Sequence, residues 1–338
     1  MIDKAISQIS NGIDLSEEDA QSALDEILTG FATETQAIAY LTALHNKGES
    51  YSELIASVKA FRKHYSMAFD GVNAVEITGT GGDGLGCFNI STAAAITAAA
   101  AGTLIVKTGN RAATSSSGSA DVLEALGINL SFPPERGREI LSRAGIAFLF
   151  NQSYPSVMKR VTSIRHRLYF ITLFNKLRWL NTSGTSMELL GVYSCELAAS
   201  LAKVLLGIGL KRGAVIHGMD GMDEISVCAE TLVFEIKNGE IRSYTICPEE
   251  LGLQRYDHGA LSGGSPQKNA RIIREVLSGQ QGGARRDAVL INAAMTLHIA
   301  NPELSLRSAI DIGRQAIDSG AALSTLEQFV DCTAEPYW

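Results

Sequence analysis

The sequence predicts an α/β fold in which a small all-α N-terminal domain precedes a large domain with a mostly parallel central sheet. Three observations support this prediction. Capped helical segments fill the first 65 residues, short apolar runs then alternate with helical ones, and the last 70 residues return to helical patterns. We therefore place the small domain at residues 1–66 and the large domain at residues 72–338.

Capping residues mark the helices of the small domain. Ser16, Thr33 and Ser50 each precede a helical segment as a predicted N-cap. Thr33 and Ser50 are followed three residues later by Gln36 and Glu53, which is the spacing of a capping box. Glycines after the first two of these segments are predicted to end them.

The large domain is predicted from about residue 74, where apolar runs begin to alternate with helical segments, as in a parallel sheet wrapped by helices. Residues 231–246 predict a β-hairpin that turns at Asn238-Gly239. The predicted strands that precede the hairpin are residues 75–77, 104–106, 148–150, 189–193 and 214–217.

Composition excludes several classes of protein. With 46% apolar and 19% charged residues among 338, the chain is expected to form packed globular domains. The excess of 36 acidic over 29 basic residues argues against broad nucleic-acid binding. Five scattered cysteines without a CxxC pair are typical of reduced thiols, and no apolar run is long enough for a membrane span. We expect a cytoplasmic protein with neither nucleic-acid nor membrane partners.

The most informative stretch is residues 77–92, where five glycines lie within eight positions between a predicted strand and an alanine-rich helix. Glycine permits positive φ and close backbone approach, and the N–H groups of such a loop and of a helix N-terminus favour phosphate. Ser91 and Thr92 lie at the helix start, where their hydroxyls can cap the helix or bind an anion or metal. The alternative is a glycine-rich turn without a ligand.

A second polar loop, residues 107–121, also follows a predicted strand and precedes a helix. Lys107 and Arg111 can neutralise phosphate, and Arg111 can do so with two parallel hydrogen bonds. The alternative is a solvated polar loop. The hydroxyls that can donate to phosphate or ribose oxygens belong to Ser115, Ser117 and Ser119.

A third loop, residues 218–224, carries the adjacent carboxylates Asp223 and Glu224 beside glycines. Magnesium binds through one or two carboxylates and bridges to substrate phosphates, so this pair is a candidate Mg²⁺ site. The alternative is an acidic helix start that the helix dipole favours. His217 is expected to be a strand-end residue, and no His/Cys metal cluster stands out in the sequence. The three loops together indicate a substrate with several phosphates and magnesium.

These motifs together resemble the anthranilate phosphoribosyltransferase family, and the similarity extends over nearly the whole chain. The order and spacing of three separate motifs make the resemblance specific. The matching segments are GTGGD (79–83), NIST (89–92), KTGNR (107–111), SGSAD (117–121) and GMDE (221–224).

The resemblance implies a glycosyltransferase family 3 fold whose small domain is split, with helices near residues 165–185 completing it through a returning segment at about 160–186. It implies a homodimer that requires Mg²⁺, with two ions expected. The implied reaction transfers the phosphoribosyl group from phosphoribosyl pyrophosphate to the amine of anthranilate and releases pyrophosphate, a step of L-tryptophan biosynthesis. No dedicated catalytic acid or base is implied, because the aryl amine already has a lone pair.

The resemblance also implies a role for individual residues. Ser91, Asp223 and Glu224 would serve the magnesium ions. Gly79, Asn110 and Arg165 would contact anthranilate, with Arg165 near its carboxylate. The phosphoribosyl pyrophosphate site would comprise Gly79, Gly82, Asp83, Cys87, Asn89, Ile90, Ser91, Thr92, Lys107, Thr108, Gly109, Asn110, Arg111, Ala112, Ala113, Thr114, Ser115 and Ser119.

Two alternatives share the implied architecture. One is a phosphoribosyltransferase for another aromatic amine, or a related nucleoside phosphorylase. The other is a catalytically impaired homologue used for binding, such as a nucleic-acid-binding relative. The acidic balance of the chain and its retained metal-site residues argue against the second.

The chain departs from the family pattern at four places. Thr108 replaces the His of KHGNR, and Cys87 stands where Ser or Thr is usual. In the acceptor segment, Ile171 replaces a second Arg and Arg178-Trp179 replaces Gly-Pro. These departures concern the acceptor side more than the phosphoribosyl pyrophosphate side.

The departures predict weakened use of anthranilate. Restoring the family residues by Thr108→His and Arg178→Gly is expected to raise kcat/KM for anthranilate, measured by initial rates at saturating phosphoribosyl pyrophosphate. An unchanged kcat/KM would contradict this account of the departures.

Overall fold

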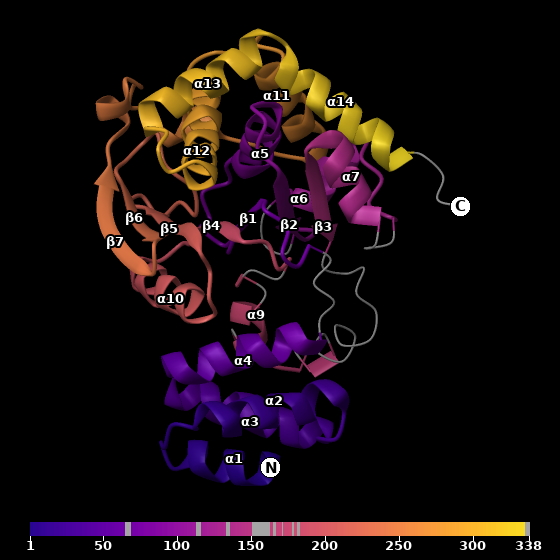
Figure 1. Cartoon of the computed structure of the whole chain (residues 1–338), viewed down its shortest axis with the longest axis vertical. Helices are drawn as coiled ribbons and strands as arrows, with labels where there is room; N and C mark the ends of the chain where they lie inside the picture. The colour runs from indigo at the N-terminus through magenta and orange to yellow at the C-terminus, as the bar shows by residue number, and fades with distance from the viewer. Residues whose placement is uncertain are drawn as a thin grey trace. The chain divides into compact units, whose positions relative to one another are not determined.

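Figure 1 traces the computed structural model of the chain. The structure describes the chain with the exception of residues 65–68, 113–115, 133–135, 151–162, 165–166, 171, 178, 181–182 and 335–338. The chain divides into two compact units. The helical unit comprises Met1–Met67, Gln152–Thr182 and Lys203–Gly209, and the α/β unit comprises Ala68–Asn151, Ser183–Ala202 and Leu210–Trp338.

The helical unit contains α1 (Ile2–Ser10), α2 (Glu17–Thr29), α3 (Glu34–Lys47), α4 (Tyr51–His64) and α9 (Leu173–Leu177). Side chains fix where its helices begin. Ser16 Oγ accepts the amide three residues on, and Thr33 and Gln36 form a reciprocal capping box. Ser50 N–H donates to Glu53 Oε2 (2.8 Å) and Glu53 N–H donates to Ser50 Oγ (3.3 Å). The caps predicted from the sequence are therefore confirmed.

The α/β unit contains β1 (Val75–Gly79), β2 (Ile105–Gly109), β3 (Ile146–Phe150), β4 (Met187–Gly191), β5 (Arg212–Gly218), β6 (Thr231–Lys237) and β7 (Glu240–Ile246). They form one seven-stranded sheet in the order β3-β2-β1-β4-β5-β6-β7. Strands β1 to β5 are parallel, whereas β6 and β7 form an antiparallel hairpin. Asn238 (φ 54°) and Gly239 (φ 79°) form its turn, so the predicted hairpin and the mostly parallel sheet are confirmed.

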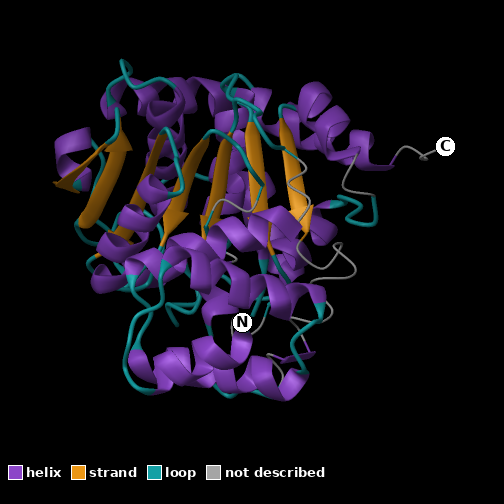
Figure 2. Cartoon of the chain, turned by 60° about the horizontal axis from the view of Figure 1, so that its bottom comes forward, coloured by secondary structure: helices purple, strands orange, loops and turns teal. Residues whose placement is uncertain are grey.

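Helices accompany the sheet, which Figure 2 shows with its strands side by side. They are α5 (Ile90–Ala100), α6 (Ser119–Leu126), α7 (Gly137–Ala144), α10 (Cys195–Gly207), η3 (Pro248–Leu251), η4 (His258–Leu261), α11 (Pro266–Leu277), α12 (Ala284–Ala300), α13 (Leu306–Asp318) and α14 (Ala321–Ala334). Helix α5 packs on β1 and β2, and α12 packs on β1, β4 and β5. Helix α5 is buried almost all round, and its alanines let α12 approach closely. The core of this unit therefore lies between the sheet and these two helices.

The chain reverses its order across the sheet at β1 and β4. From β1 it continues to β2 and β3 on one side, and it returns through β4 and β5 on the other. In open α/β sheets, ligands bind beyond the carboxyl ends of the strands at such a switch point. The strands on either side of it end in glycine, at Gly79, Gly109, Gly191 and Gly218. The topology therefore directs attention to the loops that follow these four glycines.

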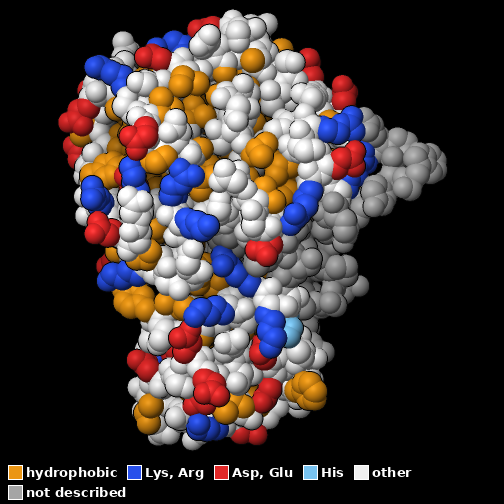
Figure 3. All heavy atoms as spheres, in the orientation of Figure 1, with side chains coloured by type: hydrophobic (Ala, Val, Ile, Leu, Met, Phe, Trp, Pro, Cys, Tyr) orange, Lys and Arg blue, Asp and Glu red, His pale blue; other side chains and the backbone are white. Residues whose placement is uncertain are grey.

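The surface carries mixed charges. On the face shown in Figure 3, acidic and basic side chains are interspersed over the described residues. Within the described parts of the chain, no helix is long and apolar enough to cross a membrane.

Candidate active site

Two paired glycines at the switch point make room for Asp223. Gly79 and Gly191 are register partners at the carboxyl ends of β1 and β4. A Cβ atom on Gly79 would lie 2.6 Å from Asp223 Oδ2, and one on Gly191 would lie 1.6 Å from the Asp223 carbonyl oxygen. The Gly81 N–H donates to Asp223 Oδ2 at 2.7 Å. The loop after β5 therefore lies directly over the ends of the two strands, and only residues without a side chain allow it.

Glu224 connects the same loop to the N-terminus of α5. Its Oε1 accepts a hydrogen bond from Ser91 N–H at 3.1 Å, so a carboxylate meets an amide in the first turn of the helix. Helix α5 begins at Ile90 with Asn89 at the N-cap position. The expectation that Ser91 or Thr92 caps the helix is therefore wrong, because both lie inside its first turn.

Asp223 and Glu224 belong to the irregular connection between β5 and β6, not to a helix. The alternative of an acidic helix start is therefore excluded for these two residues. Both residues are partly buried, as is typical of groups beside a ligand site.

Burial and mutual repulsion raise the pKa of both carboxyls. For Asp223 the pKa is raised first by desolvation and then by Asp83, and for Glu224 first by desolvation and then by Asp223. Burial also raises the pKa of Asp83. Burial lowers the pKa of the Lys107 ammonium to about 8, although Glu224 and Asp223 oppose this. Negative charge is thus in excess at this point of the fold.

This donor set fits a hard divalent cation. Carboxylate oxygens are the ligands that Mg²⁺ prefers, and Asp223 and Glu224 each accept a backbone N–H that orients the group. A cation would remove the repulsion that raises the two pKa values. Ser91 lies in the first turn of α5, and its hydroxyl is a further oxygen that could bind the cation.

The second predicted loop begins on β2. Lys107 and Thr108 are buried near its end, and Thr108 Oγ1 has no hydrogen-bond partner among the described residues. Gly118 approaches the backbone so closely that a Cβ there would lie 2.4 Å from Ala112 N. Asp121 Oδ2 accepts from both Ala112 N–H (2.8 Å) and Gly118 N–H (2.9 Å). The loop is therefore folded back tightly on its own backbone.

Arg111 is engaged by two acids in this structure. Its guanidinium donates two hydrogen bonds to Glu124, at 2.6 and 2.8 Å, and a third to Asp121 at 3.3 Å. These two acids already neutralise part of its positive charge before any phosphate binds. Sequence reasoning missed this competition because Glu124 lies on the following helix, outside the motif.

Asn89 joins the first two loops to a segment that sequence reasoning missed. Its Oδ1 accepts from Ser117 Oγ (3.2 Å) and from Asn269 Nδ2 (2.9 Å), and its Nδ2 donates to the Ser117 carbonyl (3.2 Å). The buried Asn269 lies on α11 and accepts the Gly264 N–H at 2.8 Å. Gly263 in turn donates to the Gly86 carbonyl at 2.9 Å.

The sequence did carry a signal for this fourth segment. Gly263 and Gly264 precede Ser265, whose side chain caps α11 by accepting the Lys268 N–H, and a proline follows it. This is another glycine-rich loop before a helix start, of the kind that marked residues 79–92.

The structure therefore brings together residues from all three predicted loops, but not every residue predicted for the site. Gly79, Asn89, Ser91, Asp223 and Glu224 are linked through the contacts above. Gly82 and Asp83 lie on the open part of the glycine loop, where Leu85 N–H donates to Asp83 Oδ1 at 3.3 Å. Outside the described residues lie Ala113, Thr114, Ser115, Arg165, Ile171 and Arg178.

Family models match both units. Residues 3–65 match the helical bundle domain of a glycosyl transferase family, and residues 71–323 match the α/β domain of that family. An anthranilate phosphoribosyltransferase of Methanobrevibacter smithii is 43% identical over 98% of this chain and 99% of its own. The chain belongs to the anthranilate phosphoribosyltransferase family.

Solved anthranilate phosphoribosyltransferases share the fold over nearly the whole chain. The Thermus thermophilus structure is 36% identical with a TM-score of 0.90, covering 98% of this chain and 99% of that one. A Saccharomyces cerevisiae structure in complex with phosphoribosyl pyrophosphate and Mg is 28% identical with a TM-score of 0.89 and covers 98% of both chains. Another yeast structure, with 4-fluoroanthranilate, is 27% identical with a TM-score of 0.84 and covers 99% of both. The predicted fold class and family are thus confirmed.

The glycine pair predicts a steric test. Gly191→Ala is expected to lower the free energy of unfolding by about 1–3 kcal/mol, since its Cβ would overlap the Asp223 backbone. Urea unfolding measures this. Gly282→Ala is the matched control, because its φ is not positive and its Cβ would meet no atom within 4 Å. Equal effects of the two substitutions would contradict the assigned role of Gly191.

The raised carboxyl pKa values predict a pH dependence. The folded protein retains protons that the unfolded chain loses near pH 4, so these groups stabilise the metal-free protein most below that pH. Their contribution falls as the pH rises above the unfolded-state pKa values and is lost once the pH passes the raised folded-state values. The difference in free energy of unfolding between the protein and Glu224→Gln should therefore fall from pH 4 to pH 7.

The unfolding measurements stay below about pH 8. Above that pH Lys107, whose pKa is lowered on folding, would make the free energy of unfolding rise with pH and so oppose the effect of the carboxyls. The exposed Asp311→Asn serves as control. A difference that is flat with pH for Glu224→Gln would refute the electrostatic account.

Proposed function

We propose that this protein transfers the phosphoribosyl group of phosphoribosyl pyrophosphate to the amine of anthranilate, releasing pyrophosphate, as a step of L-tryptophan biosynthesis. The proposal rests on the position of Asp223 and Glu224 over the carboxyl ends of β1 and β4, beside the glycine loop and the start of α5. The yeast relatives with phosphoribosyl pyrophosphate and Mg, and with 4-fluoroanthranilate, support this assignment.

The diphosphate end of the substrate is assigned to the glycine loop. Gly81, Gly82, Gly84 and Gly86 all have positive φ, so successive N–H groups can turn toward one concave surface. The first turn of α5 adds backbone N–H donors, and Lys107 adds a cation within reach of the acid pair. We assign the phosphoribosyl pyrophosphate site to the residues predicted for it from the sequence.

Asp223 and Glu224, with the Ser91 hydroxyl, are proposed to hold Mg²⁺, and we propose two ions. When bound, magnesium neutralises the charge that develops on pyrophosphate as the C1–oxygen bond breaks. The protein's own contribution is to orient these carboxylates through the Gly81 and Ser91 amides.

The chemical step needs positioning more than proton transfer. The amine nitrogen forms a bond to C1 with its own lone pair, the C1–oxygen bond to pyrophosphate breaks, and the nitrogen then loses a proton to solvent. Holding two substrates in line can supply about 7–11 kcal/mol of the barrier. Backbone N–H groups aimed at the leaving group stabilise its developing charge. No dedicated acid or base is therefore proposed.

Anthranilate is assigned to Gly79, Asn110 and Arg165. Gly79 ends β1 and Asn110 follows the last residue of the adjacent β2, so the two lie on neighbouring strand ends. Arg165 is proposed to meet the carboxylate.

We also propose a homodimer, for which the exposed Phe31 and Tyr169 of the helical unit are candidate contact residues. A cytoplasmic location is proposed because none of the five cysteines, each of them described, forms a disulfide.

The proposed function is tested by the loss of anthranilate fluorescence on adding the protein, Mg²⁺ and phosphoribosyl pyrophosphate. Asp223→Asn and Glu224→Gln should each lower kcat by about 10²–10³-fold, because each removes a carboxylate proposed to hold the magnesium that neutralises the leaving group. Asp311→Asn, an exposed acid on α13, should leave the rate unchanged.

Two outcomes would count against the proposal. Full activity of both acid variants would remove the role of the carboxylate pair. Binding of phosphoribosyl pyrophosphate without consumption of anthranilate would move the protein to another acceptor, which product analysis with other aromatic amines would then identify.

A further inference from the structure

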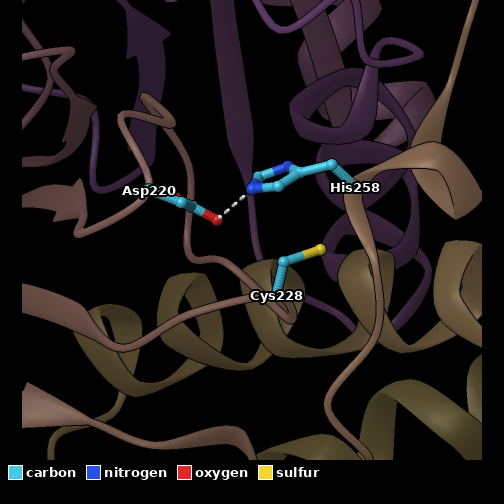
Figure 4. A group of neighbouring side chains, drawn as sticks. All are labelled: Asp220, Cys228 and His258. Atoms are coloured by element: carbon cyan, nitrogen blue, oxygen red, sulfur yellow. Dashed lines mark ion pairs between the residues drawn. The ribbon is translucent and has the colours of Figure 1, made fainter.

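Three side chains with metal-binding atoms meet in the α/β unit, next to the carboxylate pair but separate from it. They are Asp220 and Cys228, both between β5 and β6, and His258, at the start of η4. Figure 4 shows them gathered around one small space, with the Asp220 carboxylate directed at the imidazole. Their ligand atoms all lie within 4.8 Å of one another. Sequence reasoning found no such cluster because His258 is far from the other two along the chain.

We propose that Asp220, Cys228 and His258 form a binding site for a divalent transition metal of the zinc class, with a fourth position open to water. The inference concerns metal binding alone and does not depend on the proposed reaction.

The distances suit such an ion. Zinc bonds of about 2.0–2.2 Å to nitrogen and oxygen, at a tetrahedral angle, place two ligand atoms roughly 3.3–3.5 Å apart. Asp220 Oδ2 and His258 Nε2 are already 3.2 Å apart. With a Zn–S bond of about 2.3 Å, the sulfur belongs roughly 3.6 Å from the other two ligand atoms, so Cys228 Sγ needs to approach each by about 1.2 Å at most.

Supporting hydrogen bonds hold the ligands in place before any ion arrives. Ser226 Oγ donates to Asp220 Oδ2 at 2.5 Å and accepts the Cys228 N–H at 2.8 Å, so one hydroxyl orients two ligands. Tyr256 N–H donates to the Val227 carbonyl at 3.0 Å and ties the His258 segment to the same loop. Such outer partners are typical of metal sites and raise their affinity.

The donor types separate this site from the magnesium carboxylates. A thiolate, an imidazole and one carboxylate favour zinc or cobalt, whereas Mg²⁺ takes oxygen ligands. Burial, and then Asp220, raise the pKa of the Cys228 thiol, so the metal-free site holds the proton on sulfur. Binding therefore forms the metal–sulfur bond and releases that proton to solvent.

A bound ion would join the segments on either side of the candidate active site. The loop that carries Asp220 and Cys228 also carries Asp223 and Glu224, and the segment after His258 pairs with the glycine loop through Leu261 and Phe88. The ion would thus cross-link the loop between β5 and β6 to the segment that begins at His258.

The test uses the full chain freed of metal with a chelator and titrated with Zn²⁺ alone in excess Mg²⁺. We expect one equivalent of Zn²⁺ to bind, and the Co²⁺ form to show a thiolate-to-metal charge-transfer band. Cys228→Ser should lose the band and weaken Zn²⁺ binding by more than tenfold, and His258→Gln should weaken it likewise. Cys195→Ser, which removes an exposed cysteine at the start of α10, should change neither.

Failure of zinc to bind, or a charge-transfer band retained in Cys228→Ser, would overturn the proposal. If Asp223→Asn weakened Zn²⁺ binding as much as Cys228→Ser does, the proposal would also be overturned, because the ion would then bind at the carboxylates assigned to magnesium. Circular dichroism of each metal-free variant verifies its fold, and the half-exposed His258 supplies a variant with little effect on packing.

Discussion

The close approach of the Asp223 backbone to Gly79 and Gly191 is the constraint on which the rest of the site depends. Because neither strand end has a Cβ, the loop after β5 can lie against the switch point of the sheet. That position brings Asp223 to the Gly81 amide and Glu224 to the Ser91 amide. One steric condition therefore places both acids beside the glycine loop and the start of α5.

This placement concentrates negative charge at a partly buried position. Two backbone amides and Lys107 compensate the acids only in part, so the pKa values of Asp223 and Glu224 stay raised. Uncompensated charge of this kind is common at functional sites, where a bound ligand or ion neutralises it. The site is thus arranged for a cation and a phosphorylated substrate rather than for the stability of the metal-free protein.

Sequence reasoning succeeded where the physics is local and failed where distant segments meet. Caps at Thr33 and Ser50 and the turn at Asn238 depend on residues within a few positions, and each was found. The engagement of Arg111 by Glu124 and the bridge from Asn89 to Asn269 depend on how separate elements pack. A single sequence contains no direct record of those meetings.

By itself, the sequence determined the helices, the strands, the glycine loops and the family to which the chain belongs. These follow from backbone conformational preference and from the period of apolar residues, which act over short distances. The tertiary structure alone decided that Asp223 lies against a glycine pair, that Arg111 is occupied, and that Asp220, Cys228 and His258 converge. Those facts arise from the crossing of the chain between β1 and β4 and from packing between loops, which bring together atoms that sequence distance keeps apart.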